Sequence, residues 1–491
     1  MSASALWKNI ESLAEKSAGQ IAIIGEERCY TYFELQQAIQ DVAQKLTATP
    51  HRVIAFYSDN SPAWIVIDLA CHLTGITLLP LPRFFSEQQL QHAIQQAGAT
   101  AVLHHKGDRV EGLVEMIKQR DLVLTLTLTD IKTTTAQLPE QTAKITFTSG
   151  STGQPKGVCL SEQQQLSVAK SLLQTTKLTA PRHLSILPFS TLLENIGGIY
   201  APLLSGGTII ALSQETLGFN GSNGFELKKL ITIISDYEPE SMILFPELLL
   251  ALIGAINQGW LPPKSLQFIA VGGSKVSASL LQDAEKLGLP VYQGYGLSEC
   301  ASVVSLNSPS ESRPSSVGKV LSHVNIAIEQ GEIVVSGNTF LGYVNEPNSW
   351  LNLQVFTGDL GFFDQDNYLH ISGRKKNVLI SSFGRNINPE WLESELLSNG
   401  LLQQCVVFGD AKPYCVALVY PRDITCDNQT IETWIDRVNQ SLPDYAQIKK
   451  WAYLKEPLSF TNGLMTSNGR PVRNAISHEY SALIEKLYIK D

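Results

Sequence analysis

The sequence predicts an α/β protein with a large N-terminal domain of doubly wound sheets and a small, mobile α+β C-terminal domain. The first 140 residues alternate helical and strand-like patterns, as layered α/β proteins do. Several later apolar runs end at glycine-rich turns, which is typical of parallel strands whose carboxyl ends face a ligand. From Gly331 onward, short strands separated by tight turns predict an antiparallel sheet or a small β-barrel.

A basic run, Lys375-Lys376-Asn377, marks the predicted domain boundary. It divides the chain into residues 1–375 and 376–491. The second part has roughly 115 residues, which is a usual size for one domain. A helix-and-strand pattern restarts there, from Val378 to Asp410.

Composition argues against several classes of function. The formal net charge of -9 argues against a non-specific nucleic-acid binder, which needs a basic face. The seven cysteines are scattered and form no C-x-x-C pair, so we expect a reducing, cytoplasmic location with neither zinc nor disulfides. The two most apolar stretches, Trp64 to Leu81 and Met242 to Ile256, contain Asp68 and Glu247, and they predict buried helices rather than membrane spans.

Local signals predict the elements of the first 140 residues. Thr31, with Glu34 three positions later, predicts a capped helix start. Val53 to Tyr57 predicts a buried strand that ends at a turn cluster, Ser58 to Pro62. The other elements expected there are a helix from Ala63 to Leu73, a strand from Thr77 to Leu81 and a strand from Leu122 to Thr129.

Later in the chain, several strands run directly into turns or helices. We expect the ends of these strands to converge on one crevice, as they do in doubly wound sheets. The stretches are Ser185 to Asn195, which continues into an apolar helix with Gly197 and Gly198, then Met242 to Pro246, Phe268 to Gly273, and Tyr292 to Glu299.

The stretch from Thr146 to Val158 predicts a phosphate-binding loop. From Thr148 to Gly157 it contains four hydroxyl residues, three glycines and one lysine, after a short β-like lead-in. Glycines allow close approach to a ligand, and amides, hydroxyls and an ammonium suit phosphate oxygens. A Walker A loop is excluded because Pro155 and Gly157 flank Lys156. A Ser/Gly-rich surface linker is the alternative interpretation.

Four stretches, in order, resemble the adenylate-forming superfamily of acyl-CoA synthetases, peptide-synthetase adenylation domains and luciferases. They are Thr148 to Gly157, Tyr295 to Glu299, Thr357-Gly358-Asp359, and Gly373-Arg374-Lys375-Lys376 leading to Gly384 and Pro389-Glu390. The resemblance implies a two-step reaction. A carboxylate attacks the α-phosphate of ATP to give an acyl-adenylate and pyrophosphate, and a pantetheine thiol then takes the acyl group.

The resemblance also implies roles for individual residues. Lys156 and its loop would hold the β- and γ-phosphates, Tyr295 would lie against adenine, and Asp359 would accept hydrogen bonds from the ribose. The nucleotide-binding candidates are Thr148, Ser149, Gly150, Ser151, Thr152, Gly153, Gly273, Tyr295, Gly296, Ser298, Asp359 and Arg374. The catalytic candidates are Lys156, Glu299 and Arg470, the Mg²⁺ candidates are Glu299 and Thr148, and Lys376 is the candidate hinge.

Structural interpretations of the same residues remain open. The Tyr295 stretch, taken alone, also fits an ordinary aromatic-glycine loop. Asp359 after Thr-Gly also fits a side chain that closes a turn. Arg374, Lys375 and Lys376 also fit a solvated charge cluster at a linker.

The sequence departs from the family pattern near its C-terminus. The family usually has a lysine in a Ser-Gly-Lys-Ile-x-Arg loop, but the matching stretch here runs from Ser467 to Arg473 with Arg470 at the lysine position. A guanidinium is larger and planar, so the exchange is not conservative. Our hypothesis is that Arg470 does the work of the lysine.

The substrate is predicted to be a medium- or long-chain fatty acid. Phe189 to Glu194 contains no aspartate that would pair an amino-acid ammonium, and a buried, unpaired ammonium is costly. Glu194 keeps an amino-acid substrate open. Coenzyme A is the expected acceptor, with an acyl-carrier protein in trans as the other. The alternatives are an enzyme that adenylates an aryl or amino acid for a carrier protein, and a non-catalytic nucleotide- or acyl-binding homologue.

Overall fold

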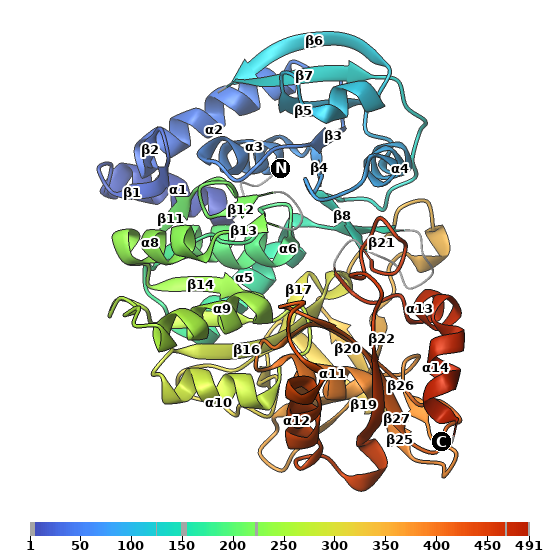
Figure 1. Cartoon of the computed structure of the whole chain (residues 1–491). Helices are drawn as coiled ribbons and strands as arrows, with labels where there is room; N and C mark the ends of the chain where they lie inside the picture. The colour runs from blue at the N-terminus through green and yellow to red at the C-terminus, as the bar shows by residue number, and fades with distance from the viewer. Residues whose placement is uncertain (1–4, 124, 149–154, 221–223, 467–468, 490–491) are drawn as a thin grey trace.

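The computed structural model describes residues 5–123, 125–148, 155–220, 224–466 and 469–489. The predicted α/β class is confirmed. Two large sheets and a smaller antiparallel sheet form a large N-terminal domain, and a small C-terminal domain packs beside it (Figure 1).

The first large sheet has eight strands in the order β21-β9-β8-β4-β3-β5-β7-β6. Its central strands β3, β4, β5 and β8 run parallel, and β9 returns antiparallel to β8. The strands are β3 (Val53–Phe56), β4 (Thr77–Pro80), β5 (Ala101–His105), β6 (Met116–Val123), β7 (Leu126–Ile131), β8 (Lys144–Thr148), β9 (Lys156–Leu160) and β21 (Gly342–Tyr343).

The second large sheet has nine strands in the order β18-β17-β16-β15-β14-β10-β11-β1-β2. The strands from β10 to β16 that neighbour one another are parallel. The strands are β1 (Ile21–Gly25), β2 (Cys29–Thr31), β10 (Arg182–Leu184), β11 (Thr208–Ala211), β14 (Ser241–Leu244), β15 (Phe268–Val271), β16 (Val291–Leu297), β17 (Ser302–Leu306) and β18 (Lys319–Val320).

Helices cover both faces of these sheets, and α2 and α3 lie between them (Figure 1). The helix predicted after Thr31 is confirmed, because the Thr31 and Glu34 side chains form a capping box. The helices are α1 (Ala5–Lys16), α2 (Tyr32–Thr47), α3 (Pro62–Thr74), α4 (Glu87–Ala97), α5 (Glu162–Thr176), α6 (Leu192–Glu194), the π-helical turn η2 (Asn195–Tyr200), α7 (Ala201–Ser205), α8 (Leu227–Tyr237), α9 (Pro246–Asn257) and α10 (Ala278–Lys286).

The predicted antiparallel segment is a four-stranded sheet, and the C-terminal domain has its own three-stranded sheet with helices on both faces. The four-stranded sheet contains β19 (Val324–Glu329), β20 (Glu332–Gly337), β22 (Gln354–Phe363) and β23 (Leu369–Arg374). The C-terminal domain contains the hairpin β24 (Leu379–Ile380) and β25 (Asn386–Ile387), the sheet strands β26 (Leu402–Phe408), β27 (Cys415–Pro421) and β28 (Ile448–Tyr453), and the helices α11 (Pro389–Leu397), α12 (Asn428–Asn439), α13 (Arg473–Glu479) and α14 (Ser481–Tyr488).

The stretch from Leu122 to Thr129, predicted as one strand, is divided between two strands in the structure. The chain forms a hairpin instead, because β6 ends at Val123, β7 begins at Leu126, and these two residues pair across the antiparallel strands. Thr125 adopts a left-handed φ of 66°. Regular alternation of leucine and threonine hides this turn, since neither glycine, proline nor asparagine marks it.

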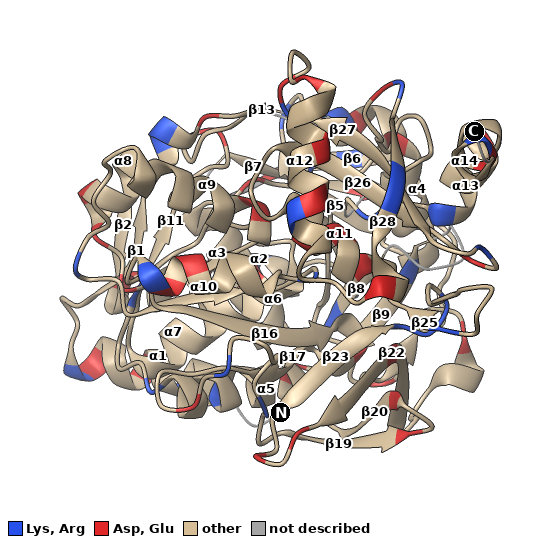
Figure 2. Ribbon diagram, turned by 60° about the horizontal axis from the view of Figure 1, so that its bottom comes forward, with Lys and Arg blue, Asp and Glu red and all other residues tan. Residues whose placement is uncertain are grey.

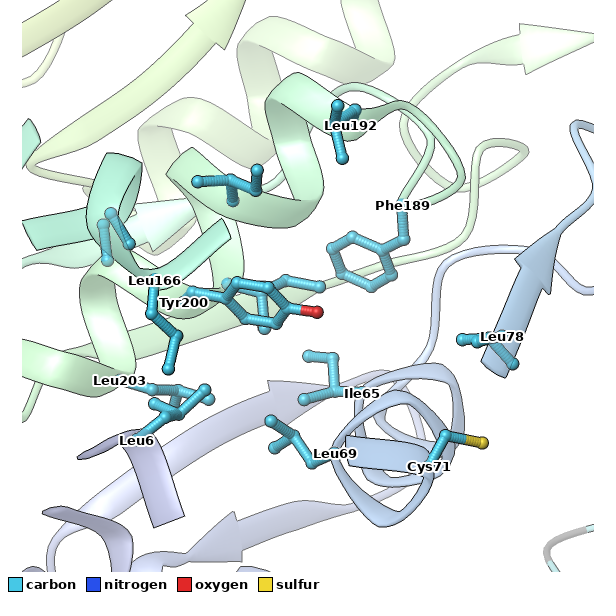
Figure 3. Close-up of a cluster of buried hydrophobic side chains, with 14 of the residues drawn as sticks. Leu6, Ile65, Leu69, Cys71, Leu78, Leu166, Phe189, Leu192, Tyr200 and Leu203 are labelled. Carbon is cyan, nitrogen blue, oxygen red and sulfur yellow. The ribbon is translucent and has the colours of Figure 1, made fainter. Parts of the chain in front are cut away.

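The main core joins the two large sheets through α3 and the α6–α7 segment. Figure 3 shows Ile65 and Leu69 of α3 facing Tyr200 and Leu203, with Phe189 beside them. All of these side chains are buried. The core therefore fixes α3 and η2 relative to the strand ends of both sheets.

A polar cluster lies inside this core. Lys144, at the start of β8, forms an ion pair with Asp68 of α3, with 2.8 Å between Nζ and Oδ1, and both side chains are buried. Asn195 Nδ2 and the Tyr200 hydroxyl donate to Asp68 Oδ2 at 3.0 and 2.6 Å. Burial is the largest influence on the Asp68 carboxyl and opposes its ionisation. The positive charges of Lys144 and His72, together with the hydrogen bonds from Lys144 and Tyr200, nevertheless hold the pKa of this carboxyl below its usual value.

Charged residues lie mainly on helices and loops, and β16 and β17 carry none (Figure 2). Within the described ranges, no helix combines the length and the apolar character that crossing a bilayer requires.

Candidate active site

Several strand ends meet at one edge of the nine-stranded sheet. β14 runs parallel to β10 and β15, and β15 runs parallel to β16. The residues that follow these strands, Phe245 after β14 and Gly272-Gly273 after β15, therefore share that edge. The expected convergence of strand ends is present in the structure.

β8 and β9 flank the predicted phosphate loop as an antiparallel pair. Thr148 and Lys156 are directly opposite each other across the two strands. Residues paired in this way project from the same face of a sheet, so both side chains lie on one side of the hairpin. The loop candidates Ser149, Gly150, Ser151, Thr152 and Gly153 lie outside the described residues.

Lys156 contacts a carboxylate and an aromatic ring from β21 and the turn after it. Its Nζ lies 2.8 and 3.0 Å from the two carboxylate oxygens of Glu346, and 4.7 Å from the ring centre of Tyr343. The Tyr343 hydroxyl in turn donates to Glu299 Oε1 at 2.9 Å. Burial, and then the Glu299 charge, raise the pKa of Tyr343, which keeps its hydroxyl a hydrogen-bond donor.

Tyr295, Asp359 and Arg374 form a second polar group. The Tyr295 hydroxyl donates to Asp359 Oδ2 at 2.7 Å, and Arg374 Nε lies 2.7 Å from Asp359 Oδ1. Asp359 and Arg374 are paired across β22 and β23, so the sheet itself sets their separation. Burial, and then the negative charge of Asp359, raise the pKa of Tyr295.

Two of the glycine candidates have packing roles. A Cβ at Gly296 would lie 1.5 Å from the Ser302 carbonyl, so the close approach of β16 and β17 requires glycine there. Gly273 has a left-handed φ of 86°, and a Cβ there would lie 3.2 Å from the Phe245 ring. Ser298 begins the short 3₁₀ turn η3 (Ser298–Cys300) that also carries Glu299.

The C-terminal domain contributes Arg470 to the edge of the nine-stranded sheet at which Gly273 lies. Its Nη2 donates to the Gly273 carbonyl at 3.0 Å. Desolvation first, and then the charge of Arg374, lower the pKa of Arg470, whereas Asp359 and Glu390 act in the opposite direction. The guanidinium of this largely exposed residue therefore interacts electrostatically with both members of the Asp359–Arg374 pair.

Lys376 lies beside the Tyr295–Asp359–Arg374 group. A cavity of about 280 Å³ is lined by Thr357, Gly358, Arg374, Lys375 and Lys376. Burial, followed by the charges of Arg374 and Arg470, lowers the pKa of Lys376. The three predicted linker cations are not equivalent, because Lys375 instead pairs with Glu332 at 2.9 Å.

The structure adds residues that the motifs do not indicate. Tyr343 contacts Glu299 and Glu346 contacts Lys156. Phe245, 36% exposed, lies beside Gly273. Lys275 interacts electrostatically with Glu390 and Glu395 of the C-terminal domain. A glycine-tyrosine pair before Glu346-Pro347 is the only local signal for Tyr343 and Glu346. Phe245 is marked only by its place at a strand end.

Glu194 already has partners inside the fold. It is fully buried, its Oε1 lies 3.0 Å from His183 Nε2, and its Oε2 accepts a hydrogen bond from the Leu187 amide at 3.3 Å. A Cβ at Gly198 would collide with it, so the helix packs directly on this carboxylate. These contacts give Glu194 a structural role and weaken the amino-acid alternative.

No group of three or more His, Cys, Asp or Glu side chains suited to a metal occurs among the residues that the structure describes. Glu299 nevertheless fits Mg²⁺, which commonly takes one or two carboxylates and completes its shell with substrate phosphates and water. Tyr343 occupies one carboxylate oxygen, and the carboxylate has a second.

Comparisons with known proteins identify the family. The chain matches the family model for AMP-binding enzymes over residues 10–344, and the model for the C-terminal domain of AMP-binding enzymes over residues 376–491. It is 27% identical to 2-succinylbenzoate–CoA ligase of Geobacillus sp. over 425 residues, which cover 79% of this chain and 81% of that protein.

Two further proteins extend the comparison. The chain is 22% identical to long-chain-fatty-acid–CoA ligase FadD15 of Mycobacterium bovis over an alignment of 550 residues, covering 89% of this chain and 88% of that one. The solved structure of O-succinylbenzoate coenzyme A synthetase (MenE) from Bacillus subtilis, in complex with ATP and magnesium ion, has a TM-score of 0.76 and 23% identity, and covers 95% of this chain and 98% of that chain.

Proposed function

Because the chain belongs to the family of AMP-binding enzymes, we propose that it adenylates an aromatic carboxylic acid with ATP and transfers the acyl group to coenzyme A. The chain is an AMP-forming acid–thiol ligase. The identity of the acid and the roles of individual residues are the proposed part.

An aromatic acid is supported by the exposed ring of Phe245. This ring lies against the backbone of Gly273, whose carbonyl binds Arg470. The exposed part of the Phe245 ring offers a flat acid a stacking surface, since aromatic pairs favour stacked or edge-on contact. The similarity to 2-succinylbenzoate–CoA ligase over about four-fifths of both chains supports the same class. A fatty acid, our first expectation, has less support.

The two groups of polar residues, one around Lys156 and one around Asp359, are assigned to different parts of the nucleotide. We assign Lys156 to the terminal phosphates and the Tyr295–Asp359–Arg374 group to the nucleoside. Arg470 would hold the reacting carboxylate or the α-phosphate, because a guanidinium binds such oxygens in bidentate fashion. Mg²⁺, held by Glu299 and Thr148, would supply positive charge at the phosphates.

Exchange of radiolabelled pyrophosphate into ATP tests the proposal. We expect benzoate-type acids, including 2-succinylbenzoate and anthranilate, to support faster exchange than dodecanoate or any amino acid. Product analysis with coenzyme A and a carrier protein then identifies the acceptor, for which we expect coenzyme A.

A long-chain fatty acid is the second candidate, and the alignment with FadD15 over 89% of the chain favours it. Exchange with dodecanoate alone would establish this candidate and reject the aromatic one. Exchange with no acid, despite measurable ATP binding, would instead indicate a binding protein without turnover.

A further inference from the structure

Two residues of one short segment join the charged groups expected at the phosphates. Glu346 holds the Lys156 ammonium through both carboxylate oxygens, at 2.8 and 3.0 Å. Tyr343, three residues earlier, places its ring 4.7 Å from the same ammonium and its hydroxyl 2.9 Å from Glu299. A continuous chain of contacts therefore runs from Glu346 through Lys156 and Tyr343 to Glu299.

The backbone of this segment is fixed from several sides. Tyr343 pairs with Val158 across β21 and β9, and its carbonyl accepts a hydrogen bond from Trp350 Nε1 at 2.9 Å. The Ser349 hydroxyl donates to the Glu346 carbonyl at 2.7 Å. The fold consequently fixes the backbone that carries Glu346, so its carboxylate reaches Lys156 from a defined position.

We propose that Glu346 is a positioning residue that competes with pyrophosphate for the Lys156 ammonium and thereby speeds release of that product. This role rests on the proposed function, in which Lys156 binds the terminal phosphates. It adds a residue that acts through Lys156 and touches neither substrate nor product.

The competition follows from charge. An ammonium that faces a carboxylate presents less net positive charge to a phosphate than an isolated ammonium does. Glu346 and Lys156 are each about two-fifths exposed, so solvent screens the pair and the effect is moderate. When pyrophosphate leaves, the carboxylate replaces it at the ammonium without movement of the backbone. A lysine without a neighbouring carboxylate would hold pyrophosphate longer.

The test is the affinity of the full-length protein for magnesium pyrophosphate, measured by titration calorimetry. Glu346→Gln keeps the side-chain shape and removes the charge, so we expect pyrophosphate to bind about three- to fivefold more tightly. Glu226→Gln is the matched control, since Glu226 pairs with Lys229 at 3.1 Å with similar exposure, and we expect no change. Melting temperatures verify folding, and Glu346→Ala is the second variant if Glu346→Gln folds poorly.

Lys156→Ala separates this inference from the proposed function. We expect it to weaken pyrophosphate binding, and we expect Glu346→Gln to have less than about a twofold effect in the Lys156→Ala background. Unchanged affinity in Lys156→Ala would reject Lys156 as the phosphate ligand, and with it the site. Weakened affinity in Lys156→Ala, without tightening in Glu346→Gln, would overturn the competition alone. Equal tightening in both backgrounds would show that Glu346 does not act through Lys156.

Discussion

Arg470 differs from a lysine in the number and geometry of its hydrogen-bond donors. One N–H of its guanidinium holds the Gly273 carbonyl at 3.0 Å. A guanidinium has five N–H donors in a planar fork, so the group can bind further oxygens besides this carbonyl. Because arginine stays protonated even where burial and Arg374 lower its pKa, the group keeps its charge at neutral pH.

We expect Arg470→Ala to reduce pyrophosphate exchange by about 100-fold, the usual cost of removing one donor to developing charge. Arg470→Lys should retain more exchange, because it keeps the positive charge but loses the fork of donors. Arg422→Ala is a matched control, since Arg422 Nε also donates to a glycine carbonyl, that of Gly400, at 3.1 Å. Exchange unchanged in Arg470→Ala would reject a role for this residue in adenylation.

The sequence predicts some of these residues and misses others for a physical reason. Lys156, Tyr295 and Asp359 lie in stretches rich in glycine and hydroxyl residues, whose chemistry is visible locally. Glu346 and Phe245 become noticeable only through contacts with residues far along the chain, such as Lys156, which is 190 positions from Glu346. Periodicity and composition carry no information about such pairs.

Among the helices and turns, too, the sequence indicates some features and leaves others unmarked. Helix α3 begins after Ser61, whose side chain caps the Trp64 amide, and ends at Gly75 in a left-handed conformation, so sequence signals mark both ends. The turn at Thr125 carries no such signal. What the sequence could not indicate about α3 is that its Asp68 pairs with Lys144 of β8.

The buried pair between α3 and β8 gives a stability prediction. Asp68→Asn leaves the Lys144 ammonium in the core without its counter-charge, and we expect a loss of about 3–5 kcal/mol in the free energy of unfolding. The double variant Asp68→Leu with Lys144→Met should recover only part of that loss, because it removes both charges but takes away the acceptor of Asn195 Nδ2 and the Tyr200 hydroxyl. Urea denaturation measures both values. A loss below about 1 kcal/mol for Asp68→Asn would contradict a tightly coupled pair.

At the scale of the whole molecule, charged residues line the contact between the two domains. Glu395 of α11 accepts a hydrogen bond from the Ser279 hydroxyl at 3.2 Å. Burial lowers the pKa of Lys275, and the charges of Glu390 and then Glu395 oppose that change. We propose that residues 1–375 and 376–491 are the two domains, that the smaller one rotates about Lys376, and that Lys275 stabilises the arrangement described here.

Charge reversal tests that stabilising role. Lys275→Glu would place a third carboxylate near Glu390 and Glu395, so we expect pyrophosphate exchange to fall about three- to tenfold while secondary structure is retained. Added salt should reduce the difference from wild type, since it screens the repulsion. Lys286→Glu on α10 is the control, because its side chain is 72% exposed and pairs with Asp283 of its own helix. Equal effects of both variants would contradict a specific interface role.

The hydrogen bond between Arg470 and Gly273 joins residues 197 positions apart. A ribosome adds residues in order, and large proteins fold domain by domain as they emerge. The N-terminal domain can therefore form its sheets, and the strand edge that carries Lys156, before Arg470 has been synthesised. With the roles proposed above, a nascent chain at that stage would bind nucleotide but lack the guanidinium, so we expect efficient adenylation only once translation has passed Arg470.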